Sequence, residues 1–81
     1  MSIDLYTTPT CGYCKQLKAV LQEKKIAYVA HDVTTSEKDF NVMQEATNGG
    51  TSVPVTVIDK GTPKQQVAVG FDDAMALLKL S

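Results

Sequence analysis

The chain has 81 residues, a formal net charge of −1 and 43% hydrophobic residues. This length supports one hydrophobic core, so we expect a single domain over residues 1–81. The composition excludes an intrinsically disordered chain, and the balanced charge argues against nucleic-acid binding. No apolar run approaches the ~18 residues of a membrane span, and residues 1–4 show no signal sequence. We therefore expect a cytoplasmic protein without nucleic-acid or membrane partners.

The first half of the chain alternates between the patterns of a strand and a helix. A β-rich run at 3–7 ends before Pro9, which cannot donate a hydrogen bond to a sheet. From Gly12 onward the apolar residues recur with a helical period, and this stripe ends before the lysines at 24–25. The residues at 26–30 then predict a second strand.

The second half predicts a helix followed by a hairpin. Ser36 and Asp39 resemble a capping box in which Asp replaces the usual Glu, and the Asn-Gly-Gly segment at 48–50 ends the helix. A β-branched strand at 53–58 and a partner strand at 65–69 follow, separated by turn residues.

A last helix is expected to open at Asp72–Asp73, with acidic residues in its first turn. The complete order β-α-β-α-β-β-α predicts an α/β fold with a four-stranded mixed sheet. The first β-α-β unit should be a right-handed parallel crossover, and the last two strands should form an antiparallel hairpin. We expect helices on both faces of this sheet.

The two cysteines, Cys11 and Cys14, stand three residues apart where a strand gives way to a helix. Backbone N–H groups and the helix dipole at this position favour a thiolate at Cys11, and Lys15 adds a positive charge nearby. Cys14 lies one turn further in, where we expect it to be more buried and a weaker nucleophile. It is placed to attack a mixed disulfide formed at Cys11.

Two other interpretations of the cysteine pair are less favoured. Zinc usually takes four ligands, and beyond the cysteines only His31 is a further soft donor. His31 itself is expected to be solvated. A structural disulfide that closes so short a loop contributes little stability and would be unusual in a reducing compartment. We therefore expect catalytic cysteines and no metal site.

Three segments together resemble the glutaredoxin family, in its order and spacing. They are residues 6–14 (Tyr-Thr-Thr-Pro-Thr-Cys-Gly-Tyr-Cys), 52–54 (Ser-Val-Pro) and 70–73 (Gly-Phe-Asp-Asp). The resemblance implies a thioredoxin-like fold and a monomeric thiol–disulfide oxidoreductase that acts as an electron carrier. Such a protein reduces protein disulfides and glutathione mixed disulfides, with glutathione as co-substrate and no permanently bound cofactor.

The resemblance also implies roles for individual residues. Val53 would present its backbone to the substrate cysteine, and the Val53–Pro54 peptide bond would be cis. Asp72 and Asp73 would receive the γ-glutamyl ammonium group of glutathione, with Asp72 also capping the last helix. The implied glutathione-binding set is Thr8, Tyr13, Lys15, Val53, Pro54, Gly70, Phe71, Asp72 and Asp73.

The sequence departs from the family at two positions, which leaves alternatives open. Thr8 replaces a lysine that commonly binds the glycine carboxylate of glutathione. Lys15 or Lys18 would have to take over this role, although each is more typical of a solvated charge on a helix face. Gly70–Phe71 resembles redoxins that donate electrons to ribonucleotide reductase and are reduced by thioredoxin reductase. Gly12 stands where proline is common, and a small residue there would permit a dimer that holds a [2Fe–2S] cluster through Cys11 and glutathione.

Overall fold

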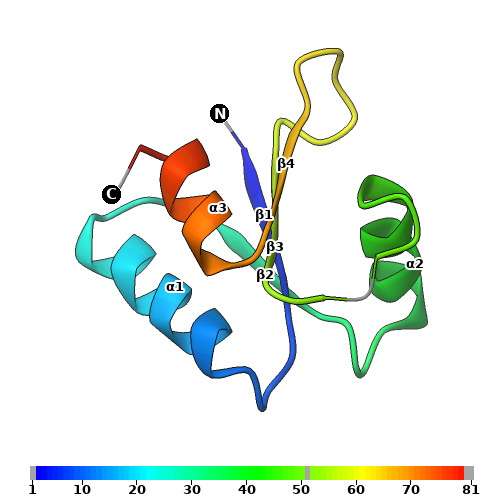
Figure 1. Ribbon diagram of the computed structural model, residues 1–81, viewed down its shortest axis with the longest axis horizontal. Helices are drawn as coiled ribbons and strands as arrows, with labels where there is room; N and C mark the ends of the chain where they lie inside the picture. Colours follow the sequence, from blue (N-terminus) through cyan, green and yellow to red (C-terminus); the bar gives the residue numbers. More distant parts are fainter. Residues whose placement is uncertain (1, 51, 80–81) are drawn as a thin grey trace.

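The chain follows the order of elements that the sequence predicts (Figure 1). The computed structural model describes residues 2–50 and 52–79. Within them, no helix is both long enough and apolar enough to span a membrane. The elements are β1 (Ile3–Thr7), α1 (Gly12–Glu23), β2 (Val29–Asp32), α2 (Glu37–Ala46), β3 (Val55–Ile58), β4 (Gln66–Val69) and α3 (Phe71–Leu77).

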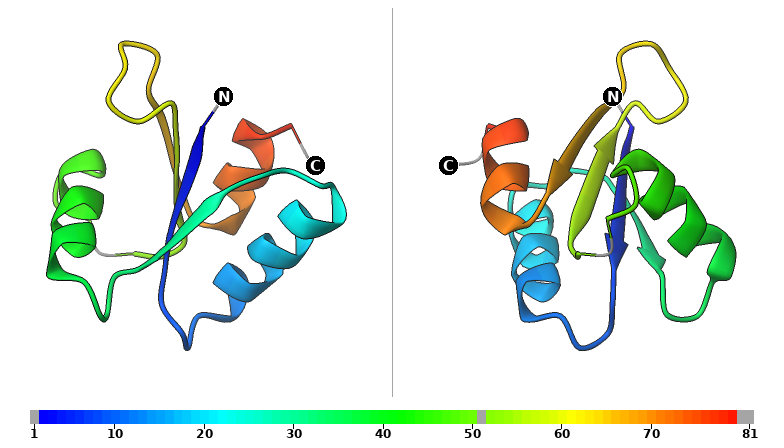
Figure 2. Two further views of the ribbon diagram at one scale, coloured as in Figure 1. Left: turned by 180° about the vertical axis from the view of Figure 1, so that it is seen from behind. Right: turned by 45° about the vertical axis from the view of Figure 1, so that its right-hand side comes forward.

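The four strands form one mixed sheet in the order β2-β1-β3-β4. β1 and β2 are parallel, with Leu5 beside Ala30, and the helix α1 connects them as a crossover. β3 is antiparallel to both β1 and β4. Helices α1 and α3 cover one face of the sheet and α2 covers the other (Figures 1 and 2). The thioredoxin-like fold is therefore confirmed.

Successive residues of β1 point to opposite faces of the sheet, because side chains alternate along a strand. Leu5 belongs to the core under α1 and α3, whereas Tyr6 belongs to the core under α2. The first core also contains Leu17, Leu21, Ala68 and Ala74. The second also contains Val33, Met43, Val55 and Val57.

The boundaries of α2 lie where the sequence predicts them. The Ser36 hydroxyl accepts the backbone N–H of Asp39 at 3.2 Å, which caps the first turn. The helix ends before Asn48 and Gly49, whose φ angles of 56° and 93° turn the chain away. The Asp39 carboxylate lies beside His31. The serine hydroxyl is therefore the part of the predicted capping box that caps the helix.

The second strand was expected at 26–30 but lies at Val29–Asp32. The apolar residues Ile26 and Tyr28 pack against the core under α1 and α3 as part of the connection. The Ile26 N–H donates to the Leu21 carbonyl at 2.9 Å, which continues the end of α1 rather than pairing with the sheet. Burial without strand pairing explains why the apolar run looked like a strand.

Candidate active site

Cys11 is the N-cap residue of α1. Its backbone is extended, with φ −83° and ψ 113°, and its sulfur accepts the backbone N–H of Cys14 at 3.1 Å. The turn before it closes through a hydrogen bond from the Cys11 N–H to the Thr8 carbonyl at 3.3 Å. Cys11 is a partly exposed residue. Its sulfur lies at the positive end of a helix, where negative charge is stabilised.

Cys14 has the opposite environment, on the inner face of the first turn of α1. Its side chain is fully buried. Burial and, secondly, a hydrogen bond with Cys11 raise the pKa of the Cys14 thiol to about 11. Both cysteines are free thiols. The two sulfurs thus differ as an attacking and a resolving thiol would, one accessible and the other buried and neutral.

The segment Val53–Pro54 lies next to the Cys11 sulfur. The Val53–Pro54 peptide bond is cis, as the family resemblance implies. The Cys11 thiol is 3.9 Å from the Val53 carbonyl oxygen, within reach of a weak S–H donor. The buried Pro54 accepts the Gly70 N–H at 2.8 Å through its carbonyl oxygen. This bond joins the start of β3 to the start of α3.

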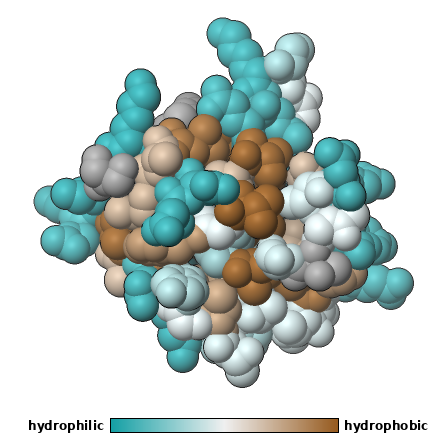
Figure 3. Space-filling view, in the orientation of Figure 1, coloured by the Kyte–Doolittle hydropathy of each residue, from teal (hydrophilic) through white to brown (hydrophobic). Residues whose placement is uncertain are grey.

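An open cleft of about 320 Å³ lies between the start of α1, the Val53–Pro54 segment and the start of α3. The Tyr13 ring, 61% exposed, leans toward the Phe71 ring across 5.9 Å between centroids. The face shown in Figure 3 carries apolar side chains across its middle, with hydrophilic side chains around and partly over them. The structure brings six of the expected binding residues together around the cleft: Tyr13, Val53, Pro54, Gly70, Phe71 and Asp72.

Three expected binding residues do not line this cleft. Thr8 contributes its carbonyl to the turn before Cys11. Lys15 is an exposed residue on α1, and Asp73 is an exposed residue on α3.

The start of α3 corrects an expectation about Asp72. The N-cap is Gly70, and no side chain of the described residues caps the first turn. Gly70 has φ 95°, a backbone angle that side chains disfavour. The helix begins at Phe71, whose ring packs against the core and beside Tyr13. Asp72 and Asp73 therefore both lie within the first helical turn, where the dipole favours their charge.

His31 was expected to be solvated, but it belongs to a polar cluster under α2. Its Nε2 lies 2.8 Å from Asp4 and its Nδ1 lies 3.5 Å from Asp39. Its ring stacks on the Tyr6 ring with centroids 4.8 Å apart. Burial raises the pKa of the Tyr6 hydroxyl, which accepts a hydrogen bond from Lys60 at 3.3 Å. The β1–β2 register places Tyr6 beside His31, a relationship that sequence pattern alone did not reveal.

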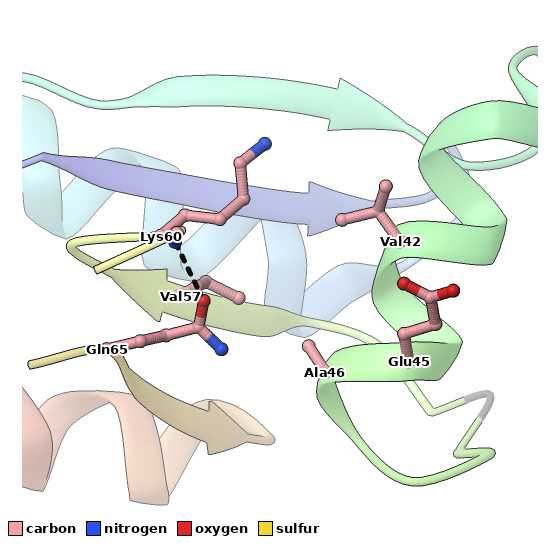
Figure 4. Close-up of a pocket in the computed structure, with 7 residues that line it drawn as sticks. Val42, Glu45, Ala46, Val57, Lys60 and Gln65 are labelled. Atoms are coloured by element: carbon pink, nitrogen blue, oxygen red, sulfur yellow. Dashed lines mark hydrogen bonds between the residues drawn. The ribbon is translucent and has the colours of Figure 1, made fainter. Parts of the chain in front are cut away.

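A second pocket of about 250 Å³ lies between α2 and the β3–β4 hairpin (Figure 4). Its floor is apolar, with Glu45 and Lys60 at its sides. Gln65 accepts the Gly61 N–H at 3.0 Å and so holds the turn (Figure 4). Its lining contains no thiol, and it lies on the α2 face, away from Cys11. Across residues 2–50 and 52–79, no cluster of three or more His, Cys, Asp or Glu side chains could hold a metal ion.

The comparisons with known proteins agree with this geometry. A glutaredoxin family model matches residues 3–61. A glutaredoxin-like 8.6 kDa protein from a rubredoxin operon of Clostridium pasteurianum is 35% identical over 72 residues, which cover 89% of this chain and 88% of that protein.

Two solved structures are also similar. The thioredoxin-like protein BC3987 has a TM-score of 0.80 and 29% identity, covering 99% of this chain and 100% of that one. The glutaredoxin-like NrdH-redoxin from Escherichia coli has a TM-score of 0.76 and 18% identity, covering 100% and 96%. With Cys11 as the N-cap of α1, a buried Cys14 and the matched sequence, the chain belongs to the glutaredoxin family, as a glutaredoxin-like thiol–disulfide redoxin.

Proposed function

We propose that this protein reduces protein disulfides and glutathione mixed disulfides, and that glutathione returns it to the dithiol state. The observation that carries the proposal is the contrast within the cysteine pair. Cys11 is a partly exposed residue whose sulfur lies beside the Val53 carbonyl, whereas Cys14 is fully buried. An accessible thiol at a helix start is suited to attack, and a buried partner is suited to resolve the product.

In the first step, the Cys11 thiolate attacks one sulfur of a substrate disulfide. The bond between the substrate sulfurs breaks as a bond to Cys11 forms, and one substrate thiolate leaves. In the second step, Cys14 attacks the Cys11 sulfur, so the Cys11–Cys14 disulfide forms and the second substrate thiolate leaves. Two electrons pass from the protein to the substrate. Two glutathione molecules then reduce the Cys11–Cys14 disulfide and become one oxidised glutathione.

The reduction of glutathione mixed disulfides requires only the Cys11 thiol. Cys11 takes the glutathionyl group and releases the reduced substrate, and a second glutathione removes that group from Cys11 as oxidised glutathione. Cys14 is not required in this branch. The two classes of substrate therefore separate the contributions of the two cysteines.

The cleft beside Cys11 supports a site for glutathione. The Val53 backbone would pair with the cysteine residue of glutathione, and the Asp72 carboxylate would accept a hydrogen bond from its γ-glutamyl ammonium group. Among the residues that the structure describes, Asp72 is the one charged residue that lines this cleft. Lys15, exposed on α1, would have to move toward the cleft to meet the glycine carboxylate. We therefore expect modest glutathione affinity.

A second candidate is a redoxin that serves ribonucleotide reductase and is reduced by thioredoxin reductase. The observation that favours it is the apolar pair formed by Tyr13 and Phe71 at the cleft, which would suit a protein surface. The solved NrdH-redoxin, described as having a thioredoxin-like activity profile, also has nearly the same chain length and fold.

A direct test compares the two donors with one protein disulfide substrate. Glutathione with glutathione reductase is supplied in one assay, and thioredoxin reductase in the other, each with NADPH oxidation as the readout. Faster turnover with glutathione supports the first proposal, whereas turnover with thioredoxin reductase alone selects the second. A brown dimer from aerobic purification would instead point to a [2Fe–2S] carrier.

A second test uses the cysteine variants Cys14→Ser and Cys11→Ser. We expect Cys14→Ser to retain activity on glutathione mixed disulfides and to lose most activity on protein disulfides. Cys11→Ser should lose both activities. Equal losses in both variants on both substrates would contradict the branch that needs one thiol, and with it the glutathione proposal.

A further inference from the structure

The second half of the proposed reaction depends on Cys14, a thiol that is difficult to ionise. Its side chain is fully buried, and burial is the main reason that its pKa rises to about 11. In the reduced protein, very little of the Cys14 thiol is therefore ionised near pH 7. Because the thiolate is the nucleophile, a group that favours the Cys14 thiolate would speed the resolving step.

Lys18 lies one helical turn beyond Cys14 on α1. Residues four apart share a face of a helix, so the Lys18 side chain extends from the side that carries Cys14. Lys18 is partly buried, whereas Lys15 is exposed. The Lys18 ammonium and the Thr8 backbone N–H both lower the pKa of Cys14 and so oppose the effect of burial. Of these two groups, Lys18 is the one that a side-chain substitution can remove.

A carboxylate, Asp32, also lies within the electrostatic reach of Lys18. Asp32 pairs with Thr7 across β1 and β2, at the end of the sheet where the chain turns toward Cys11. Hydrogen bonds from Thr34 are the main reason that the pKa of Asp32 is lowered, and the Lys18 ammonium lowers it further. The charge of Lys18, which is carried by α1, thus acts both on Cys14 in the same helix and on Asp32 at the end of β2.

We propose that Lys18 is a positioning residue for the resolving step, with its ammonium stabilising the Cys14 thiolate as it attacks Cys11. This inference rests on the proposed function. Cys14 gives its proton to solvent, and its sulfur forms a bond to the Cys11 sulfur. The bond from Cys11 to the substrate sulfur breaks, and the substrate thiolate leaves and takes a proton from solvent. Lys18 stays protonated throughout.

The test separates the two steps with 5,5′-dithiobis(2-nitrobenzoate), a coloured aromatic disulfide. One equivalent is mixed with the reduced protein, and the released thiolate is followed by stopped-flow absorbance between pH 6 and 9. The attack of Cys11 releases the first aromatic thiolate, and the attack of Cys14 releases the second. The Cys14→Ser variant should release only the first, which assigns the two phases.

Lys18→Met should slow the second release by about three- to fivefold, the range expected for losing one partly exposed charge. It should also move the rise of the second rate to higher pH and leave the first release unchanged. Lys18→Arg, which keeps the charge, should restore the second rate. Lys38→Met, on the opposite side of the sheet in α2, controls for the loss of one positive charge elsewhere.

An unchanged second release in Lys18→Met would overturn the inference. An equal slowing in Lys38→Met, or no recovery in Lys18→Arg, would also overturn it. These outcomes leave the proposed function standing, because the wild-type protein still completes both releases. A wild-type protein that makes the first release and never the second would instead contradict the two-thiol mechanism, and the role of Lys18 with it.

Discussion

The Cys11 sulfur accepts the backbone N–H of Cys14 at 3.1 Å, so the attacking thiol also caps the helix that carries the resolving thiol. A side chain in this position satisfies one of the N–H groups that the first helical turn leaves unpaired. A charged acceptor makes a stronger hydrogen bond than a neutral one. The start of α1 is therefore sensitive to the chemical state of Cys11.

Two substitutions at Cys11 should separate this structural role from the chemical one. Cys11→Ala removes the acceptor and should lower the free energy of unfolding by about 1 kcal/mol, the usual cost of losing an N-cap. Cys11→Ser provides a hydroxyl acceptor and should remain close to wild type. Both variants should be inactive. Urea unfolding of the reduced proteins measures the difference, and equal stabilities for the two variants would show that the sulfur does not cap the helix.

The raised pKa of Cys14 predicts a dependence of stability on pH. The folded-state pKa of about 11 lies above the value of about 8.5 for a free thiol. The stability contributed by the protonated thiol is therefore fully present below about pH 8.5 and is lost as the pH rises through 11. We expect the wild-type protein to lose stability over this range relative to Cys14→Ala. Urea unfolding at several pH values tests this, and parallel curves would contradict it.

Thr56 offers a stabilising substitution. Its hydroxyl is buried and, among residues 2–50 and 52–79, has no hydrogen-bond partner. Replacing a buried, unpaired hydroxyl with a methyl group removes a desolvation cost, so Thr56→Val should raise the free energy of unfolding by about 1 kcal/mol. Thr47→Val is the matched control, because the Thr47 hydroxyl donates to the Met43 carbonyl at 2.9 Å. It should be destabilising, and a loss of stability in both variants would refute the prediction.

The sequence predicted elements well where one local signal acts alone. The Ser36 cap and the turn at Asn48 are properties of a few adjacent residues, and both were expected. The strand at Val29–Asp32 was misplaced because Ile26 and Tyr28 are apolar for packing against the core, and pattern cannot distinguish packing from pairing.

The polar cluster under α2 shows why some side-chain arrangements could not be predicted from the sequence. His31, Asp4 and Asp39 come from three elements, and only the pairing of β1 with β2 and the docking of α2 bring them together. The cysteine pair was predictable because Cys11 and Cys14 are one helical turn apart. The start of α3 at Phe71 was not, because Gly70, with φ 95°, takes the N-cap position that was expected for Asp72.

Gly12 should accept proline. A Cβ atom at this position would meet no atom within 4 Å. Gly12 is the first residue of α1, where proline is favoured, and the extended Cys11 backbone suits a residue that precedes proline. Gly12→Pro should raise the free energy of unfolding by about 0.4 to 1 kcal/mol, because it restricts the unfolded chain. Thermal and urea unfolding provide the measurement, and a destabilised variant would contradict the prediction that proline fits at this position.

Asp72 and Asp73 form a matched pair for the glutathione proposal. Both lie in the first turn of α3, so replacing either with asparagine should cost a similar 0.3 to 1 kcal/mol or so of stability. Only Asp72 lines the cleft beside Tyr13 and Val53.

A charge-assisted hydrogen bond to a ligand is worth roughly 1.5 to 3 kcal/mol, less at an exposed site. Since each 1.4 kcal/mol or so is tenfold, Asp72→Asn should lower glutathione-dependent turnover by several-fold to about tenfold, and Asp73→Asn by much less. Turnover and thermal unfolding measured on both variants separate binding from stability. Equal turnover in Asp72→Asn and wild type would favour thioredoxin reductase as the donor, because a glutathione molecule docked through its γ-glutamyl ammonium group would lose its charged partner.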